Sequence, residues 1–157
     1  MSRCVRFERE IAIAAPADRV FAELSEPTRF LGLQPLLASV EELPAVNGVR
    51  AFAAVERVRV LGAIALPSRL RVELRPRTGE HRVEFATRAP LGIALAGAFT
   101  IEPRGDASIV REDVALTCSR WLLGFVLPQA IRAQEALLAN LKDRLESAVD
   151  PAGESRA

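Results

Sequence analysis

The stretch EIAIAAPADRVFAEL, residues 10–24, decides the fold class of this 157-residue chain. It begins as a strand, because its isoleucines alternate with smaller or charged residues and therefore share one face. At Ala15-Pro16 it changes into an amphipathic helix. Pro16 suits the first helical turn, where its missing N–H costs nothing, and Asp18 suits the positive end of the helix. The sequence therefore predicts that the first strand turns sharply into a helix at residues 15–16.

Most of the chain beyond residue 35 consists of strand-like runs separated by turn signals. Asn47-Gly48 is a strong hairpin signal, and Thr78-Gly79 and Gly105-Asp106 are further good ones. Consecutive strands joined by short turns pair antiparallel, so the pattern predicts a meander. With the first strand included, the expected strands span about 3–13, 36–45, 48–60, 63–76, 80–88, 93–103 and 107–118.

Helices are expected only near the two ends of the chain. A second short helix begins at Pro27 and ends at Gly32, and one long helix spans about 120–149. Because proline removes a backbone donor, Pro128 predicts a kink or a break in the long helix near Leu127. Residues 150–157 are polar and are predicted to form a flexible C-terminal tail.

Several short motifs occur in a fixed order: Ile13-Ala14-Ala15-Pro16 followed by Val20-Phe21, then Pro27, Pro35 and Gly48, and finally LLANLKDRLE at 137–146. In this order they resemble the START-like helix-grip superfamily (SRPBCC), in particular its polyketide cyclase/dehydrase and lipid-transport branch. The resemblance implies an α+β helix-grip fold, in which a curved, seven-stranded antiparallel sheet wraps around the long C-terminal helix and two short helices connect the first and second strands. It implies one domain over residues 1–149, with an apolar cavity between sheet and helix.

Strand alternation places two charged side chains, Arg9 and Glu112, on the inward face of the first and last strands. If these strands are neighbours, the two side chains come close together, and an inward charge is costly unless it is paired. One interpretation is a structural salt bridge, which is favoured; the other is a polar anchor for a ligand head group. Cys4 shares the outward face whereas Cys118 points inward, so both are expected to be free thiols.

Two other polar residues have alternative interpretations. His81, the only histidine, shares a face with Val83 and Phe85, so it is either an inward general base or, as favoured, a strand-end histidine that reaches solvent. Gln134 lies in the middle of the apolar stripe of the long helix. Its amide is expected to line the cavity, where it meets backbone, water or a ligand.

Inner faces of the middle strands complete the predicted cavity. The third strand turns either Glu56 or Arg57 inward, with Glu56 favoured, and the inner row of the fourth strand is apolar except for Ser68. The candidate ligand-binding residues are Arg9, Leu70, Val72, His81, Phe85, Phe99, Glu112, Gln134, Leu138 and Leu141.

Composition argues against several functional classes. The 21 basic and 20 acidic residues nearly cancel and form no basic block, so nucleic acid and an anionic membrane are poor partner candidates. No apolar run is long enough for stable membrane insertion, and the charged N-terminus is unlike a signal peptide, so a cytoplasmic location is expected. The two cysteines do not have zinc-site spacing, and no nucleotide-binding motif occurs, so neither metal nor cofactor is expected.

Three functions remain. The first is binding of a hydrophobic small molecule, such as a lipid, an acyl chain, a polyketide or an isoprenoid, in the internal cavity. The second is a polyketide cyclase or aromatase-like enzyme that uses the same cavity. The third is a protein-interaction or regulatory module. A carrier predicts a closed apolar cavity, a cyclase predicts an open cavity with converging polar groups, and an interaction module predicts a filled interior.

Overall fold

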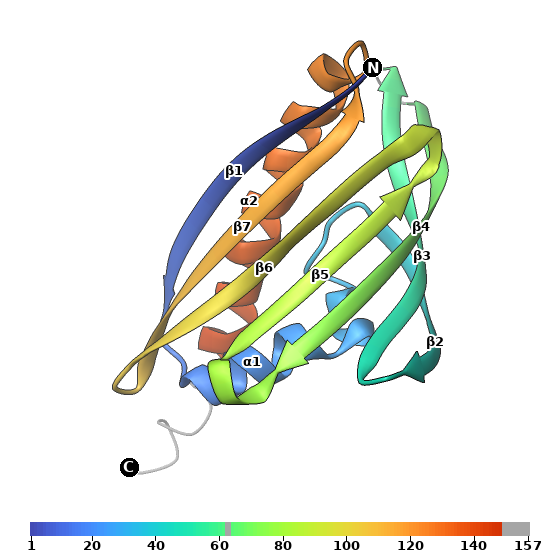
Figure 1. The fold of residues 1–157 in the computed structure, drawn as a ribbon. Helices are drawn as coiled ribbons and strands as arrows, with labels where there is room; N and C mark the ends of the chain where they lie inside the picture. The colour runs from blue at the N-terminus through green and yellow to red at the C-terminus, as the bar shows by residue number, and fades with distance from the viewer. Residues whose placement is uncertain (62–63, 149–157) are drawn as a thin grey trace.

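A computed structural model describes residues 1–61 and 64–148 (Figure 1). The elements in chain order are β1 (Ser2–Ile13), α1 (Ala17–Ser25), the 3₁₀ turn η1 (Pro27–Phe30), β2 (Leu37–Val46), β3 (Val49–Leu61), β4 (Ile64–Arg77), the 3₁₀ turn η2 (Thr78–Glu80), β5 (Arg82–Ala89), the 3₁₀ turn η3 (Pro90–Gly92), β6 (Ile93–Arg104), β7 (Ala107–Ser119) and α2 (Leu123–Ser147). The expected tail, 150–157, lies outside the described residues, and the domain boundary at 149 stays a prediction.

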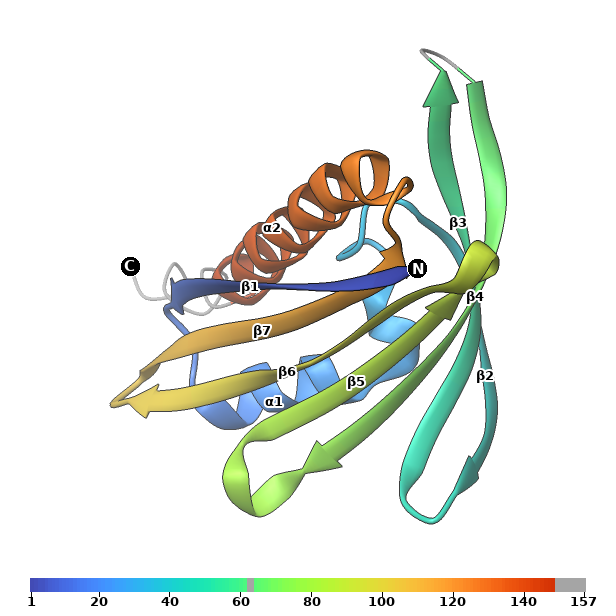
Figure 2. The same ribbon diagram turned by 45° about the horizontal axis from the view of Figure 1, so that its top comes forward.

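The strands form one seven-stranded antiparallel sheet in the order β1-β7-β6-β5-β4-β3-β2. The sheet curves around α2, which confirms the helix-grip fold (Figures 1 and 2). Tight turns make this meander possible: Asn47 and Gly48 both adopt positive φ, at 53° and 76°, as a two-residue hairpin that follows the twist of the strands requires. The first and last strands are neighbours, and Arg9 lies directly opposite Glu112.

The Ala15-Pro16 corner closes one end of the sheet. Pro16 is the residue before α1, with φ −61° and ψ 147°, and only residues 14–16 separate the end of β1 from the start of the helix. Ser108 on β7 fixes this corner, because its buried hydroxyl donates a hydrogen bond of 2.7 Å to the carbonyl oxygen of Ala15. The corner therefore carries α1 and η1 across the lower end of the sheet (Figure 1).

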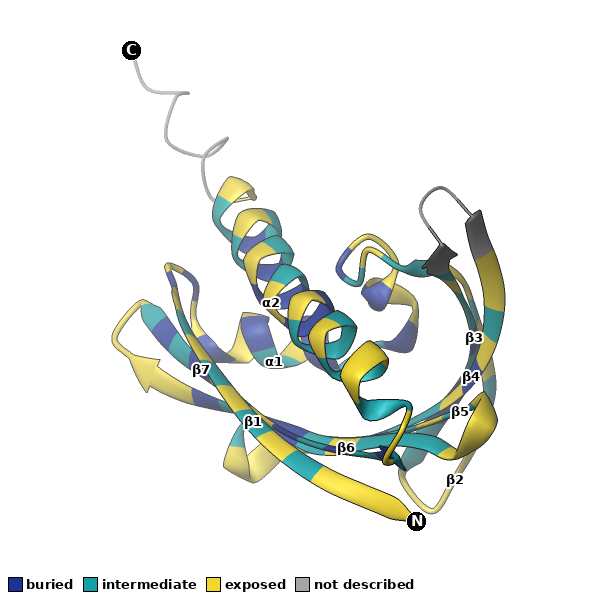
Figure 3. Cartoon of the chain, turned by 90° about the horizontal axis from the view of Figure 1, so that it is seen from above, coloured by how far each residue is buried: buried dark blue, intermediate teal, exposed yellow. Residues whose placement is uncertain are grey.

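The core lies between the inner face of the sheet and one side of α2 (Figure 3). The two halves of α2 contribute differently to this core. The second half supplies four buried leucines, each of which stabilises the fold by about 2 kcal/mol, whereas the first half turns the small side chains of Ala130 and Ala133 toward the sheet. The leucines are Leu137, Leu138, Leu141 and Leu145. The lower end of the molecule is therefore filled, and free volume remains near the start of α2.

Polar contacts fasten the second half of α2 to the segment that precedes β2. The side-chain amide of Asn140 donates to the carbonyl oxygen of Leu33 at 2.8 Å, and the guanidinium of Arg144 donates to that of Leu31 at 2.9 Å. Gly32 between them has φ 84°, which a glycine adopts without strain; the short helix itself ends two residues earlier than expected, at Phe30. These bonds hold the segment that brings Gln34 to the cavity.

The sequence predicted a kink or a break near Leu127; the break is not found, and a kink stays a prediction. The described part of α2 is continuous across Pro128, and it begins at Leu123 rather than at residue 120. Pro128 is the sixth residue of the helix, so its missing N–H removes only the hydrogen bond to the carbonyl oxygen of Gly124. That carbonyl lies in the first turn, where backbone groups can bond to solvent instead, and so the helix continues through the proline. Both cysteines are free thiols as expected, Cys4 exposed and Cys118 buried.

Candidate functional site

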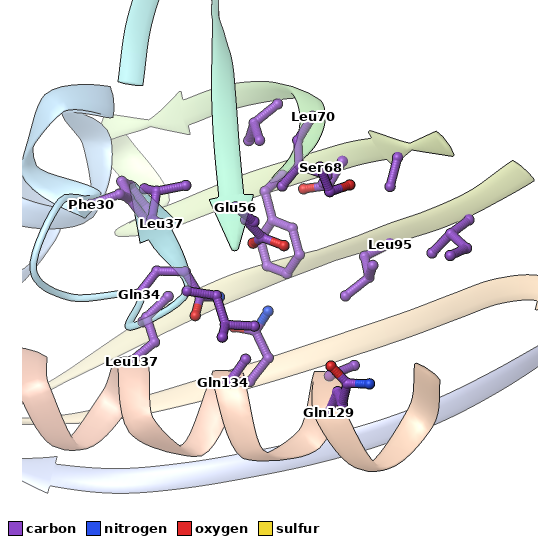
Figure 4. Close-up of a pocket in the computed structure, with 18 of the residues that line it drawn as sticks. Phe30, Gln34, Leu37, Glu56, Ser68, Leu70, Leu95, Gln129, Gln134 and Leu137 are labelled. Carbon is purple, nitrogen blue, oxygen red and sulfur yellow. The ribbon is translucent and has the colours of Figure 1, made fainter. Parts of the chain in front are cut away.

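A cavity of about 200 Å³ lies between the first half of α2 and the inner faces of β3–β6 (Figure 4). It exists because α2 presents Ala130 and Ala133 to the sheet at this level, where its second half presents leucines. Interiors are normally packed without voids larger than a water molecule, so two small residues that face a curved sheet leave space unfilled. The sequence of α2 thus determines which end of the molecule is hollow.

The walls of the cavity are mainly apolar. Phe30, Leu74, Phe85, Phe99 and Leu137, all buried, close its lower end. The rings of Phe85 and Phe99 are tilted by 41° with centroids 5.1 Å apart, which is a favourable aromatic arrangement. At the other end the lining includes Phe125, which is 45% exposed. The cavity therefore opens to the surface where α2 begins.

Polar side chains enter the cavity from three elements. Figure 4 shows Glu56 on β3, Gln34 in the segment before β2 and Gln134 on α2 pointing into the same space. Ser68 is the cross-strand partner of Glu56, so its hydroxyl lines the cavity at the same level. The side-chain oxygens of Gln34 and Gln134 are buried and have no hydrogen-bond partner within the described residues. Such atoms are uncommon in protein interiors and mark places where a water or a ligand group is expected.

Glu56 is the ionisable group of this site. Burial raises the pKa of its carboxyl above the ordinary value of 4.5, and no other cause contributes. Alternation explains the absence of a neighbouring cation: the flanking Arg57 and the opposing strand's Arg69 occupy the other face of the sheet and are exposed. A carboxyl of this kind retains its proton to a higher pH than usual, and it can donate a hydrogen bond or a proton.

Half of the candidate residues named from the sequence lie in the cavity lining. These are Leu70, Val72, Phe85, Phe99 and Gln134. Leu138 and Leu141 belong instead to the filled part of the core below it. Arg9, His81 and Glu112 are not part of the lining. A ligand-binding role for any of these residues stays a prediction.

Arg9 and Glu112 occupy the predicted register but do not form the expected salt bridge. The Arg9 guanidinium turns to Glu135 on α2, with 2.9 Å between Nε and Oε1, where both side chains are partly exposed. Glu112 is fully buried, and neither carboxyl oxygen has a hydrogen-bond partner among the described residues. Burial raises the pKa of Glu112 to about 8, although the positive charge of Arg9 acts in the opposite direction. Desolvation therefore outweighs the attraction of the facing cation.

His81 is not the first residue of β5 but lies in the turn before it, with φ 45°. Its Nε2 atom is 2.7 Å from the Asp18 carboxylate on α1, and its ring contacts the edge of Phe21. The alternation of side chains along a strand does not apply to a residue with a left-handed backbone. The prediction that His81 shares a face of the sheet with Val83 was therefore wrong. His81 links the β4–β5 turn to α1, which agrees with the interpretation as a residue that reaches solvent.

Sequence analysis missed Gln34, Thr87 and Gln129, which also line the cavity. Gln34 lies in an irregular segment, between Gly32 and Pro35, that has no periodicity from which a face could be assigned. Thr87 has the parity of Phe85 on β5, so alternation alone could have found it. The inward placement of Glu56 and Ser68 is as expected.

Two further features are absent from the described residues. No group of three or more histidine, cysteine, aspartate or glutamate side chains there could hold a metal ion. Within the same residues, no helix has the length and apolar character needed to cross a membrane.

Comparison with solved structures finds the same fold in proteins of low sequence identity. The Zhui aromatase/cyclase from Streptomyces sp. R1128 superimposes with a TM-score of 0.74 at 17% identity, over 96% of this chain and 99% of that chain. A START superfamily protein from Mycobacterium smegmatis gives 0.75 at 15% identity, over 92% and 99%. Norcoclaurine synthase from Thalictrum flavum, in complex with dopamine and hydroxybenzaldehyde, gives 0.68 at 16% identity, over 95% and 90%.

No curated protein matches the sequence. A family model does: the one described as polyketide cyclase / dehydrase and lipid transport matches residues 5–146. That match includes β1 from Val5 onward, the other six strands and α2 up to Glu146, as the sequence motifs led us to expect. The chain therefore belongs to the polyketide cyclase/dehydrase and lipid transport family.

Proposed function

We propose that this protein binds a hydrophobic small molecule in the cavity between α2 and the sheet. The observation that carries the proposal is an apolar cavity with a few inward polar groups, two of whose oxygen atoms have no partner among the described residues. Ligand sites typically combine these two features: apolar walls supply affinity and a small number of polar groups fix orientation. A location in the cytoplasm stays a prediction.

The dimensions of the cavity constrain the ligand. Its volume of about 200 Å³ is below the range of about 300–1,000 Å³ that is usual for ligand sites. A small ring system or the end of a chain fits inside, and the remainder of a longer molecule leaves through the end where Phe125 is exposed. Lipid, acyl, polyketide and isoprenoid molecules all have a suitable apolar part.

The polar groups favour a ligand that carries a carbonyl or hydroxyl group on its apolar framework. A protonated Glu56 donates one hydrogen bond, the Ser68 hydroxyl donates or accepts one, and the amide of Gln134 offers both kinds of group. Because burial raises the pKa of Glu56, its donor form persists to higher pH than in an exposed glutamate. A pure hydrocarbon would leave all of these groups unsatisfied.

A cyclase-type enzyme is the second candidate. The opening of the cavity and its converging polar groups are what a cyclase was expected to have, and the carboxyl of Glu56 favours it as well. Glu56 retains a proton that it can deliver to a carbonyl oxygen held by Gln134 and Ser68, which is the task of a general acid. A solved aromatase/cyclase has this fold, so the architecture is compatible with that chemistry. The third candidate, an interaction module, predicts a filled interior, and the cavity counts against it.

Native mass spectrometry of freshly purified protein, followed by extraction of the bound molecule, tests the proposal first. A stoichiometric apolar passenger is the expected result, and its release in altered form would favour the enzyme. An empty mass, combined with no uptake from a panel of lipids and polyketides, would contradict both the carrier and the cyclase.

A matched pair of variants tests whether the cavity is the site. Ala133→Leu fills the space between α2 and the sheet, whereas Ala139→Leu adds the same side chain on the exposed side of the same helix. Both replace alanine by another strong helix former, so intrinsic helix propensity changes little. Ala133→Leu should weaken ligand binding at least tenfold and Ala139→Leu should leave it unchanged. Equal affinity in both variants would place the ligand elsewhere.

A further inference from the structure

Large apolar side chains are exposed around the open end of the cavity. Trp121 is 82% exposed, Leu91 76% and Leu66 52%, and the partly exposed Phe125 lines the cavity itself. They come from the β7–α2 connection, η3, the start of β4 and the start of α2. Figure 1 places these elements at the same end as the N-terminus, and Figure 3 shows them around the space beside α2. We call this set of four residues the apolar rim.

These elements meet through the fold and not through the sequence. The backbone N–H of Arg120 donates to the carbonyl oxygen of Met1 at 3.1 Å, which joins the N-terminus to the β7–α2 connection. The turn η3 contacts both β7 and β4. Residues that are about 55 positions apart along the chain, such as Leu66 and Trp121, therefore belong to one end of the molecule.

Basic residues predominate at this end. Its described stretches, 1–5, 57–61, 64–70, 87–95 and 117–132, contain no aspartate or glutamate. Six exposed arginines occur in them, and none forms an ion pair with a described residue; they are Arg3, Arg57, Arg69, Arg88, Arg120 and Arg132. Elsewhere in the described chain most arginines face a carboxylate, as Arg77 faces Glu84 at 2.8 Å.

We propose that the apolar rim and its arginines form a docking surface for an anionic lipid bilayer. Tryptophan is favoured at the boundary between head groups and acyl chains, and basic residues near an anionic surface are attracted to it. The four apolar residues come from four separate segments of the chain, which suits insertion between head groups better than packing on a folded partner. Docking there would face the open end of the cavity toward the membrane.

This proposal revises the expectation drawn from the sequence, which found no basic block. The arginines are spread over 130 residues of sequence, and only the meander gathers them at one end. It differs from stable insertion, because no element is expected to cross the bilayer. It also does not rest on the proposed cavity ligand, since vesicle binding and ligand uptake are measured separately.

Trp121 supplies the measurement, because it is the only tryptophan and the chain has no tyrosine. Vesicles of phosphatidylcholine with phosphatidylglycerol are added, and tryptophan emission and co-sedimentation are followed. With anionic vesicles the emission should shift to shorter wavelength and the protein should sediment with the lipid. Pure phosphatidylcholine should give much less binding. Raising salt from about 0.1 M to about 1 M shortens the screening length from about 10 Å to about 3 Å, so it should weaken binding strongly.

Charge reversals at the two ends of the molecule provide the control. Arg88→Glu and Arg120→Glu should each lower partitioning onto anionic vesicles at least tenfold at low salt. Arg19→Glu should leave it unchanged, because Arg19 is equally exposed and forms no ion pair among the described residues but lies on α1 at the opposite end. Circular dichroism checks that each variant is folded.

Three outcomes would overturn the proposal. One is the absence of both the emission shift and co-sedimentation with anionic vesicles at low salt. Another is an equal emission shift with polyglutamate or duplex DNA, which would show an acidic protein or a nucleic acid to be as good a partner as a bilayer. An equal loss of binding in Arg19→Glu would also contradict it, because net charge alone would then explain the effect.

Discussion

Glu112 provides the sharpest test of the electrostatics of this fold. Its side chain is fully buried on β7, its carboxyl oxygens have no hydrogen-bond partner among the described residues, and the facing Arg9 is turned toward Glu135. Burial raises its pKa from 4.5 to about 8. The substitution Glu112→Gln keeps the size and polarity of the neutral carboxylic acid but cannot ionise. It should therefore remove one specific pH dependence of stability.

The size of the effect follows from the two pKa values. In the unfolded chain Glu112 loses its proton above its ordinary pKa of 4.5, whereas in the folded protein it keeps the proton up to about 8. The folded state thus binds more protons over this interval, and the free energy of unfolding falls as pH rises, by about 1.4 kcal/mol per pH unit. The loss is under about 1 kcal/mol at pH 5, about 3 kcal/mol at pH 7 and about 4 kcal/mol at pH 8. Glu112→Gln should recover these amounts.

Urea unfolding followed by far-ultraviolet circular dichroism at pH 5, 7 and 8 measures the difference. Wild type and Glu112→Gln should differ little at pH 5, and the variant should be the more stable by about 4 kcal/mol at pH 8. The control is Ser108→Ala on the same strand, which removes a buried hydroxyl that does not ionise. Its difference from wild type should not depend on pH. Parallel pH profiles of wild type and Glu112→Gln would refute the reasoning.

Three further predictions concern the strands, the corner and the cavity. Gly97→Ala should lower the free energy of unfolding by about 3 kcal/mol, measured by thermal melting, because the new Cβ would lie 1.9 Å from a carbonyl oxygen of β7. Gly79→Ala is the control, because a Cβ at that position meets nothing within 4 Å. Ser108→Ala should cost about 1–3 kcal/mol in urea unfolding, since it leaves the buried carbonyl of Ala15 without its donor. Calorimetric titration with a neutral carbonyl ligand should show affinity falling up to tenfold per pH unit above the raised pKa of Glu56, and Glu56→Gln should remove that dependence.

Much of the architecture could be predicted because strands obey a simple rule. Side chains alternate between two faces, so the inward placement of Ser68 and Glu112 followed from their neighbours in sequence. On the third strand alternation left Glu56 and Arg57 as alternatives, and the favoured Glu56 is the one that lines the cavity. Antiparallel pairing of the first and last strands then put Arg9 opposite Glu112. Register fixes Cα positions, however, and a long guanidinium can reach several partners, so alternation could not predict that Arg9 pairs with Glu135 on the helix.

The remaining errors arose where the rule does not apply. His81 has a left-handed backbone in a turn, and strand parity has no meaning there. Gln34 enters the cavity from an irregular segment whose path is set by bonds from distant residues, such as that from Asn140 to Leu33. Pro128 is tolerated because it lies near the beginning of the helix, and that beginning was placed three residues too early.

The shape and the polar atoms of the cavity cost the fold stability that a bound molecule can restore. Each buried polar atom without a partner costs about 1–3 kcal/mol, and the oxygens of Gln34 and Gln134 are two such atoms. Replacing the small Ala130 and Ala133 with larger apolar residues would add buried surface and fill the space, as the leucines do further along α2. A molecule that satisfies these atoms and fills the space acts in the same direction: at a concentration about one hundred times its dissociation constant it stabilises the folded state by about 3 kcal/mol. Unpaired polar atoms and unfilled volume lower stability without a ligand, and a ligand that pairs the atoms and fills the volume gains affinity from both. The residues that leave this end of the core loosely packed are therefore the ones that favour it as the functional site.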